Sequence, residues 1–456
     1  MKDRQDQSFN ENTRMKSPSP IIPPHSEITH WVGVSIPRAG HHYLARLLKA
    51  SLGSALHYCE FYSPLDCCRT IPCTRQSSAR IVFQKNHDFD LSLDPHLPHC
   101  LYLVQTRDPL LEAMSDRELA EAVYPELKDD LDELVVWLGK KAAYYCHFYR
   151  KWVTEAPPQC IHITYRSLVE QPAETLRTIF DRTGLVVESQ SILAAIAGQS
   201  GKRDESGRIF APRAAKISDV QRPYFNCFAA IVANLVNGTI RSISERSEFG
   251  IGEAIRLAAV AHGATLGHDR VSASSGWQAF CEKFPANSHG QVEYSHCLQA
   301  QGDPRKALHC ALQAVRLTPL RMAATKRGRD LLNQQGRFRT ARRLSAIVAE
   351  RFPDRPAALI DHAVDLFHAG YVPEAVAVAR RFIEVAKAVP LAWEDPHQLW
   401  YLRAYAFGFN VSLFWEVAGN ILKAGGETRL GLDAAGIAHA MSQDYTRFHA
   451  GGELAP

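Results

Sequence analysis

Three glycines recur at an interval of 34 residues in the C-terminal half of this 456-residue chain, at Gly302, Gly336 and Gly370. An alanine stands five residues after each glycine, and prolines recur at the same period: Ala307, Ala341, Ala375, Pro285, Pro319 and Pro353. A fixed period of this length is typical of stacked helical hairpins, in which each unit buries its apolar face against its neighbours. We therefore predict an all-α solenoid over residues 250–425. Since such arrays present binding surfaces, we expect any chemistry to lie before residue 245.

The repeat divides this half into four units, 254–287, 288–321, 322–355 and 356–389, with His268 at the glycine position of the first. The glycine ends one helix, and the alanine is small because the two helices of a hairpin cross closely there. This spacing resembles that of tetratricopeptide repeats. We expect residues 395–424, with Gly408 between two helical stretches, to form a degenerate closing unit and residues 426–456 a loosely ordered tail.

Positive charge is concentrated on the third unit and its leading edge. The cations are Arg321, Lys326, Arg327, Arg329, Arg337, Arg339, Arg342 and Arg343. Two interpretations stay open: a surface for an acidic partner or acidic substrate, or a solvated polar face. The resemblance to tetratricopeptide repeats implies a peptide or protein partner on the concave surface.

The bulk composition excludes several classes of protein. A hydrophobic fraction of 46% with 22% charged residues is that of a soluble globular protein of two or three domains. A net charge of +4 is too small to indicate nucleic acid as a partner. No apolar run approaches the roughly 18 residues of a membrane-spanning helix. Residues 1–27 are polar and rich in proline, without the apolar core of a secretory signal, so we predict a disordered tail and a cytoplasmic protein.

Eleven cysteines, an odd number, favour reduced thiols in the cytoplasm over a disulfide framework. Four of them lie close together in the sequence, at Cys59, Cys67, Cys68 and Cys73. They contain no C-x2-C pair, which structural zinc sites usually have. We therefore predict a thiol-rich loop and no bound metal.

The N-terminal half alternates short apolar segments with helical patterns. Strands are predicted at His30–Ile36, Ala79–Lys85, Cys100–Thr106 and Cys160–Tyr165. Helical periodicity runs from Tyr43 to Gly53, over 110–121 and 130–154, and from Pro172 to Gly184. Buried strands that alternate with helices predict an α/β domain over residues 28–245, with a parallel sheet covered on both faces.

Ligands bind beyond the carboxyl ends of the strands in such a sheet, so the residues that follow each strand are the candidates. After the first strand, Arg38 and Gly40 precede a helix whose N-terminus favours an anion. Lys85 and His87 follow the second strand, and Arg107 follows the third. The chain has neither G-x-x-x-x-G-K-[ST] nor G-x-G-x-x-G, so an NTP-hydrolysing loop and a dinucleotide fold are not supported.

Three segments of this half resemble the PAPS-dependent sulfotransferases, in the order found in that family. SIPRAGHHYLARLL resembles the 5′-phosphosulfate loop, and YLVQTRDPLLEAMSDREL resembles the 3′-phosphate motif. ITYRSLVEQPAETLRTIFDRTGL is similar to a third family landmark, and SGKRDESGR at 200–208 is faintly similar to a late loop. The resemblance implies a P-loop-like sheet domain that transfers a sulfuryl group from 3′-phosphoadenylyl sulfate (PAPS) to a hydroxyl or amine, releasing 3′,5′-adenosine bisphosphate (PAP).

The resemblance also implies a set of cofactor-binding residues: Arg38, Ala39, Gly40, His41, His42, Tyr43, Arg107, Ser115 and Tyr165. Arg107 and Ser115 match the pair that holds the 3′-phosphate, and Tyr165 matches the tyrosine near the adenine. Arg38 stands where the family usually has lysine, and it cannot donate a proton because it stays charged. His41 and His42 replace threonines whose hydroxyls touch phosphate, which leaves the backbone N–H groups as the expected contacts.

The segment IVFQKNHDF is similar to a Lys-x-His segment of the family, which implies catalytic roles. We expect His87 to act as general base on the acceptor, because imidazole has a suitable pKa. Lys85 and Arg38 would stabilise charge on the departing phosphate. Glu60 is the alternative base.

The leading functional hypothesis is a sulfotransferase whose repeats recruit or orient the acceptor. The competing hypothesis is a non-catalytic scaffold, in which a decayed sulfotransferase domain is structural and the repeats bind partners. The sequence leaves the acceptor undefined.

Overall fold

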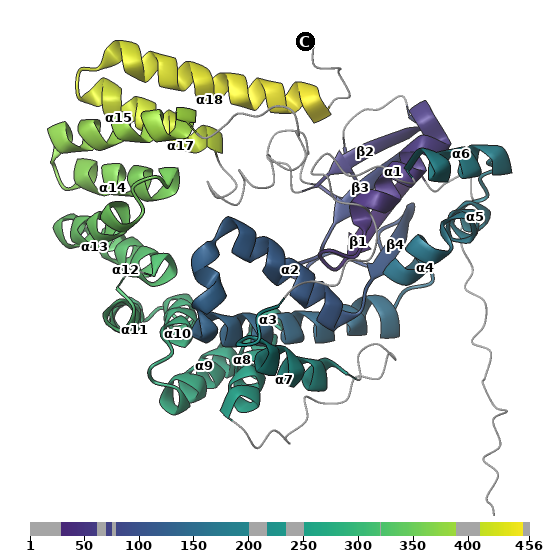
Figure 1. Ribbon diagram of the computed structural model, residues 1–456, viewed down its shortest axis with the longest axis horizontal. Helices are drawn as coiled ribbons and strands as arrows, with labels where there is room; N and C mark the ends of the chain where they lie inside the picture. Colours follow the sequence, from purple (N-terminus) through teal and green to yellow (C-terminus); the bar gives the residue numbers. More distant parts are fainter. Residues whose placement is uncertain are drawn as a thin grey trace, which may run out of the picture.

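The computed structural model describes residues 29–61, 70–74, 79–199, 217–233, 250–319, 321–388 and 411–449. A sheet with helices on both faces occupies one side of the molecule, and an arc of helical hairpins occupies the other (Figure 1). Several segments singled out in the sequence lie outside the described residues: the 1–27 tail, Cys67, Cys68, the 200–208 segment and Gly408.

The sheet has five parallel strands in the order β2-β3-β1-β4-β5. They are β1 His30–Ser35, β2 Leu56–Glu60, β3 Ile81–Asn86, β4 Cys100–Thr106 and β5 Cys160–Thr164. The predicted parallel sheet is confirmed, and β4 has the predicted bounds. The edge strand β2 was not predicted, because its sequence, LHYCE, alternates polar and apolar residues without an apolar run.

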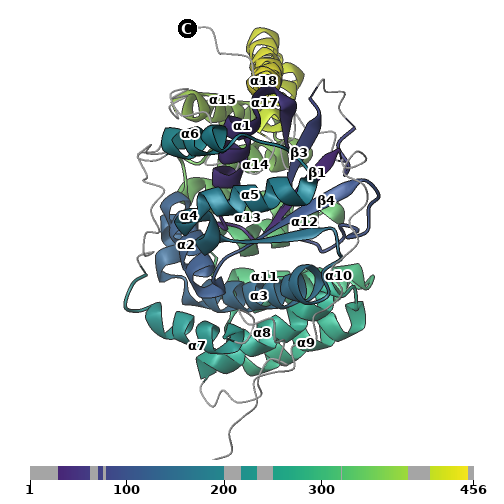
Figure 2. The ribbon, with the colours of Figure 1, turned by 90° about the vertical axis from the view of Figure 1, so that its right-hand side faces the viewer.

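Each face of the sheet is covered by helices, since strand residues alternate between two cores. Trp31, Leu101 and Leu103 pack with α1 (His41–Leu52), α5 (Pro172–Thr183) and α6 (Ser189–Gln199). Val32 and Val104 face the opposite core, which is built around α3 (Leu131–Tyr149). Figure 2 shows the two layers, with α5 and α6 on one side and α3 on the other. The remaining elements of this half are α2 (Pro109–Val123), η2 (Pro125–Asp129), η3 (Arg150–Thr154), α4 (Tyr165–Glu170) and α7 (Arg222–Val232).

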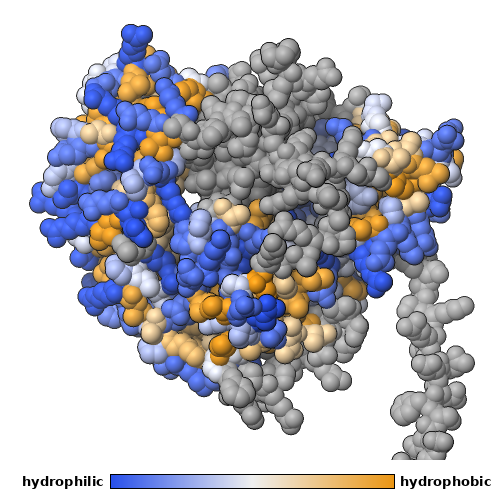
Figure 3. Space-filling view, in the orientation of Figure 1, coloured by the Kyte–Doolittle hydropathy of each residue, from blue (hydrophilic) through white to orange (hydrophobic). Residues whose placement is uncertain are grey.

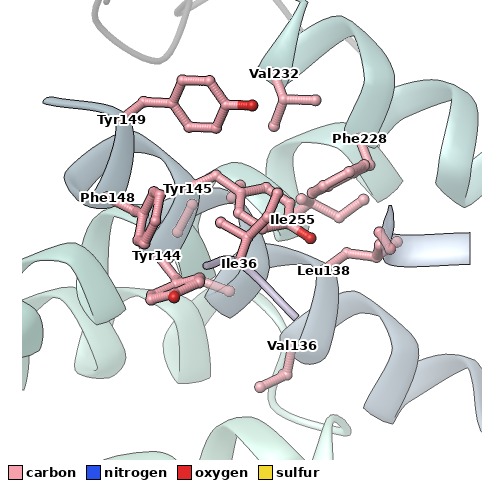
Figure 4. Close-up of a cluster of buried hydrophobic side chains, with 14 of the residues drawn as sticks. Ile36, Val136, Leu138, Tyr144, Tyr145, Phe148, Tyr149, Phe228, Val232 and Ile255 are labelled. Atoms are coloured by element: carbon pink, nitrogen blue, oxygen red, sulfur yellow. The ribbon is translucent and has the colours of Figure 1, made fainter. Parts of the chain in front are cut away.

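The core around α3 extends into the first helical hairpin, which begins with α8 (Gly250–Leu266). Tyr145 of α3, Phe228 of α7 and Ile255 of α8 are buried together (Figure 4). A Cβ atom added at Gly139 would lie 2.5 Å from the Cβ atom of Ala258, so the backbones of α3 and α8 are in close contact. One hydrophobic core therefore spans the boundary between the α/β half and the first helical hairpin.

The C-terminal half is a solenoid of helical hairpins, as predicted. Gly302, Gly336 and Gly370 each have a positive φ, of 83°, 70° and 86°. The alanines that follow them by five residues are fully buried. The hairpins are α8 with α9 (Arg270–Lys283), α10 (Ser288–Ala300) with α11 (Pro304–Leu317), α12 (Met322–Gln334) with α13 (Phe338–Arg351), α14 (Pro356–His368) with α15 (Val372–Ala388), and α17 (Val411–Ala424) with α18 (Thr428–His449).

The last hairpin corrects the predicted C-terminal boundary. Thr428–His449 form α18, and the turn before it is made by Gly426, with a φ of 87°. The predicted loosely ordered tail is therefore wrong for these residues. Gly431 takes the small-residue position five residues after the turn, where an added Cβ would lie 2.7 Å from the carbonyl oxygen of Gly419. The unit escaped the sequence analysis because Gly426 is 56 residues after Gly370, out of the 34-residue period.

In the described part of the chain, none of the helices combines the length and apolar character that crossing a bilayer requires. The surface of the repeat arc, at the left of Figure 3, is mainly hydrophilic in that view.

The close contact between α3 and α8 gives a stability prediction. We expect Gly139→Ala to lower the free energy of unfolding by about 2 kcal/mol, because the added methyl group overpacks the joint between the two halves. Gly198 is the matched control, since it also lies in a helix and an added Cβ there meets nothing within 4 Å. Gly198→Ala should leave stability unchanged or raise it by up to about 1 kcal/mol through helix propensity. Urea unfolding measures both, and a Gly139→Ala protein as stable as the native one would contradict the shared core.

Candidate functional site

The strand order creates a crevice beyond the carboxyl ends of β1 and β4. The chain leaves β1 toward β2 and β3 on one side of the sheet, and it leaves β4 toward β5 on the other. Neighbouring strands whose connections diverge in this way open a crevice in which α/β proteins bind ligands. The loops that border it contain Arg38 and Arg107.

The loop after β1 is anchored by two of its residues, which are buried in the hydrophobic core. Ile36 and Ala39 are buried in the cluster that surrounds α3, whereas the side chain of Arg38 is exposed. Arg38 and Gly40 have φ values of 59° and 87°. An added Cβ at Gly40 would lie 2.8 Å from the ring of Tyr165, so only glycine fits between this ring and the start of α1. The first N–H groups of α1, which lack partners within the helix, follow directly.

Arg107 connects the two loops. Its Nη1 donates a hydrogen bond to the carbonyl oxygen of Arg38 at 3.1 Å, and its guanidinium carbon lies 4.6 Å from the centre of the Tyr165 ring. Tyr149 fixes the backbone, because its hydroxyl donates to the Arg107 carbonyl oxygen at 3.0 Å. The buried Nε of Arg107 has no hydrogen-bond partner among the described residues. On the other side, Nε of Arg38 donates to Oγ of Ser115 at 3.4 Å. The structure thus brings Arg38, Gly40, Arg107, Ser115 and Tyr165 together, as predicted.

A second group lies at the ends of β2 and β3. Lys85 Nζ is 3.0 Å from a carboxylate oxygen of Glu60 and 3.3 Å from Nε2 of His42. Tyr58 donates its hydroxyl to the other Glu60 oxygen at 2.8 Å. Glu60 is therefore held in an ion pair, which makes it a weaker candidate for the base than the sequence suggested.

His87 is oriented by the end of β1. Its Nδ1 lies 2.6 Å from the carbonyl oxygen of Ser35. This bond requires a proton on Nδ1, so the neutral ring carries its lone pair on Nε2. Burial, followed by the charge of Lys85, lowers the pKa of His87 to about 3. The ring is therefore neutral at physiological pH and able to accept a proton, but the lowered pKa makes it a weaker base than the free imidazole on which the sequence prediction relied.

The side chains predicted to bind the cofactor at the start of α1 do not all face the crevice. The His41 side chain is buried and its ring stacks on Phe83 at 5.2 Å, so it points into the core and cannot reach an anion in the crevice. Ala39 is also buried, which leaves only its backbone available. His42 is exposed and Tyr43 partly exposed at the start of α1.

A buried charge cluster that was not predicted from the sequence lies beneath the site. Glu112 of α2 is fully buried, and one of its oxygens lies 3.1 Å from Nζ of Lys141 on α3. Lys141 also pairs with Asp116 at 2.6 Å. Burial raises the pKa of Glu112 to about 8. The spacing of two acids, Glu112 and Asp116, four residues apart on the helix of Ser115 was the available signal.

Among the described residues, the cysteines and the repeat cations singled out in the sequence lie outside the candidate site. Cys59 and Cys73 pack with Val82 in a small buried cluster.

Some cations of the third repeat form hydrogen bonds and ion pairs inside the solenoid. Arg327 is buried and donates to Oγ of Ser295 at 2.9 Å, and Arg329 pairs with Asp361 at 2.7 Å. The side chains that stay exposed are Lys326, Arg337, Arg339 and Arg343.

Comparison with known proteins adds little. Neither a protein-family model nor a curated protein matches the chain. Among solved structures, a crystal structure of MamA is 10% identical and covers 41% of this chain and 97% of its own, with a TM-score of 0.33. MamA 41-end from Desulfovibrio magneticus RS-1 is 9% identical and covers 41% of this chain and 94% of its own, also with a TM-score of 0.33. Similarity this low carries no argument about function.

The buried imidazoles predict a pH dependence of stability. Burial, followed by the charge of Lys85, lowers the pKa of His41 as well as that of His87. Since the unfolded chain then binds more protons than the native one, stability is full above the unfolded pKa of about 6.5 and is lost as pH falls below it. Each such group contributes a slope of up to about 1.4 kcal/mol per pH unit. We expect His87→Asn to flatten the dependence between pH 6 and pH 4, measured by urea unfolding. The same substitution at the exposed His96 is the control, and an unchanged slope in His87→Asn would contradict this assignment.

Proposed function

We propose that this chain transfers a sulfuryl group from PAPS to a hydroxyl or amine of an acceptor. The observation that carries the proposal is the convergence of Arg38 and Arg107 at the ends of β1 and β4, the neighbouring strands whose connections diverge. Two arginines, a helix N-terminus and a serine hydroxyl in one crevice suit a ligand with two anionic ends. The strand order and the loop before α1 also support a P-loop-like sheet.

The residues present fit such a donor. Arg107 and Ser115 would hold the 3′-phosphate, and the buried Nε of Arg107 still lacks a partner among the described residues. Tyr165 offers a ring face beside Gly40, where adenine can pack. The turn at Gly40 and the first N–H groups of α1 would hold the 5′-phosphosulfate.

The proposed chemistry needs no redox step. As the acceptor oxygen or nitrogen forms its bond to sulfur, its proton passes to Nε2 of His87, and the bond between sulfur and the bridging oxygen of the phosphate breaks. The negative charge that remains on the departing PAP is stabilised by Arg38 and Lys85. A bound anion would also offset the charge of Lys85, which is one of the causes that lower the pKa of His87.

The scaffold hypothesis keeps one observation in its favour. Because the His41 ring packs in the core, the first loop offers fewer side-chain contacts than the sulfotransferase pattern does. In both hypotheses the outer repeats are a surface for an acceptor or a protein partner.

Nucleotide binding separates the two hypotheses. We expect calorimetry to show binding of PAP, and Arg107→Ala to weaken it by about 10- to 100-fold, because a hydrogen bond to a charged group contributes about 1.5–3 kcal/mol. Ser115→Ala should weaken it less. Arg166→Ala is the control, since Arg166 follows Tyr165 but is exposed and pairs with Glu170. A native protein that does not bind PAP at millimolar concentration would exclude the enzyme hypothesis.

The role of His87 has its own prediction. His87→Asn should lower turnover by about 10²- to 10⁴-fold, the usual contribution of a general base. PAP affinity should stay within a few fold, because the base acts on the acceptor. Turnover requires a screen of labelled sulfuryl transfer across acceptor classes. A loss of PAP affinity in this variant would instead assign His87 to the phosphate site.

A further inference from the structure

The corner between α2 and α3 is strongly acidic. Residues 126–133, with the sequence ELKDDLDE, contain Glu126, Asp129, Asp130, Asp132 and Glu133. This corner leads from α2 through η2 into α3 and faces the inner side of the repeat arc (Figure 1). It belongs to the α/β half in sequence, but the carboxylates of Glu126 and Asp130 are paired with residues of the repeats. Glu133 instead pairs with Arg117 of α2.

One position of the repeat makes these contacts in three successive units. Asn287, Arg321 and Arg355 are 34 residues apart, each directly before the first helix of its hairpin. Nδ2 of Asn287 donates to the carbonyl oxygen of Asp132 at 3.1 Å, and Arg321 pairs with the carboxylate of Asp130. The period of the solenoid therefore sets a row of donors along its inner side, and the acidic corner lies along that row.

The contact of Arg355 is bidentate. Its Nη1 and Nη2 donate to the two carboxylate oxygens of Glu126, each at 2.7 Å, and its guanidinium lies 5.4 Å from the ring of Tyr124. A forked arginine–carboxylate pair fixes orientation as well as distance.

Asp130 is the most enclosed member of the corner. Its carboxylate caps α3 by accepting from the N–H of Glu133 at 2.9 Å, and it lies 3.3 Å from Nε2 of His289 as well as against Arg321. Burial alone would raise the pKa of Asp130, but the bonds from His289 and the Glu133 N–H outweigh it, so the pKa is lowered. The carboxylate therefore stays ionised and paired with the repeats.

From this row of donors we infer that the inner surface of the hairpins α10–α11, α12–α13 and α14–α15 is a receptor for an acidic helix corner, and that its occupant is residues 124–133 of the same chain. The repeats hold the C-terminal end of α2. The N-terminal half of α2 carries Ser115 at the candidate site. This clamp, formed by Asn287, Arg321 and Arg355 on residues 124–133, therefore sets the position of the hydroxyl that would hold the 3′-phosphate. This last consequence rests on the proposed function, whereas the clamp itself does not.

A charge-reversal cycle on the full-length protein tests the clamp. Arg355→Glu and Glu126→Arg each break the pair, and the double variant restores it with reversed sign. In each single variant we expect amide hydrogen exchange of residues 115–133 to become at least fivefold faster and PAP affinity to fall severalfold. In the double variant, exchange should return to within about twofold of the native rate. Arg380→Glu is the matched control, because it breaks the Arg380–Glu427 pair near the far end of the solenoid and should leave exchange in 115–133 unchanged.

Two results would overturn the inference. One is native exchange rates in both single variants, and the other is a double variant that exchanges as fast as the singles. A native protein that fails to bind PAP would remove the proposed function alone, since hydrogen exchange reports on the clamp without any nucleotide.

Discussion

Helix α3 is buried on two sides, and this burial holds the sheet, the site loops and the first repeat together. One side of the helix packs on β1 and β4, and the other packs on α7 and α8. The same core takes in Ile36 and Ala39 of the loop after β1, and Tyr149 bonds to the backbone of Arg107. The two loops that border the crevice are therefore fixed by one helix, and the first repeat completes the core that fixes it.

This arrangement concentrates charge where a small ligand could use it. Arg107 is hydrogen-bonded to the backbone of Arg38, so two like charges lie close together. The ring of Tyr165 and the carboxylate of Glu112 lie near Arg107. A bound anion would offset the repulsion between the two guanidinium groups. The repeats add a second electrostatic contact at the other end of α2, so the helix is held at the site by its capped N-terminus and at the solenoid by its acidic corner.

Local patterns explain why much of this could be read from the sequence. The bounds of β4 followed from an apolar run, and the grouping of Arg107 with Ser115 followed from the resemblance of their segment to the 3′-phosphate motif of sulfotransferases. The direction of individual side chains could not be predicted from such local patterns. His41 and His42 are adjacent, yet one packs on Phe83 and the other is exposed. The joint at Gly139 and the partners of Asp130 depend on elements distant in sequence, and no local pattern encodes them.

The loops after β1 and β4 are proposed to hold the two phosphorylated ends of one adenine nucleotide, and a crystal structure of the protein with PAP would show whether they do. We expect the 3′-phosphate in hydrogen-bond contact with Arg107 and Ser115, the 5′-phosphate at the turn of Gly40, and the adenine against Tyr165. A nucleotide bound elsewhere on the molecule, or crystals that take up no nucleotide at saturating concentration, would contradict this proposal.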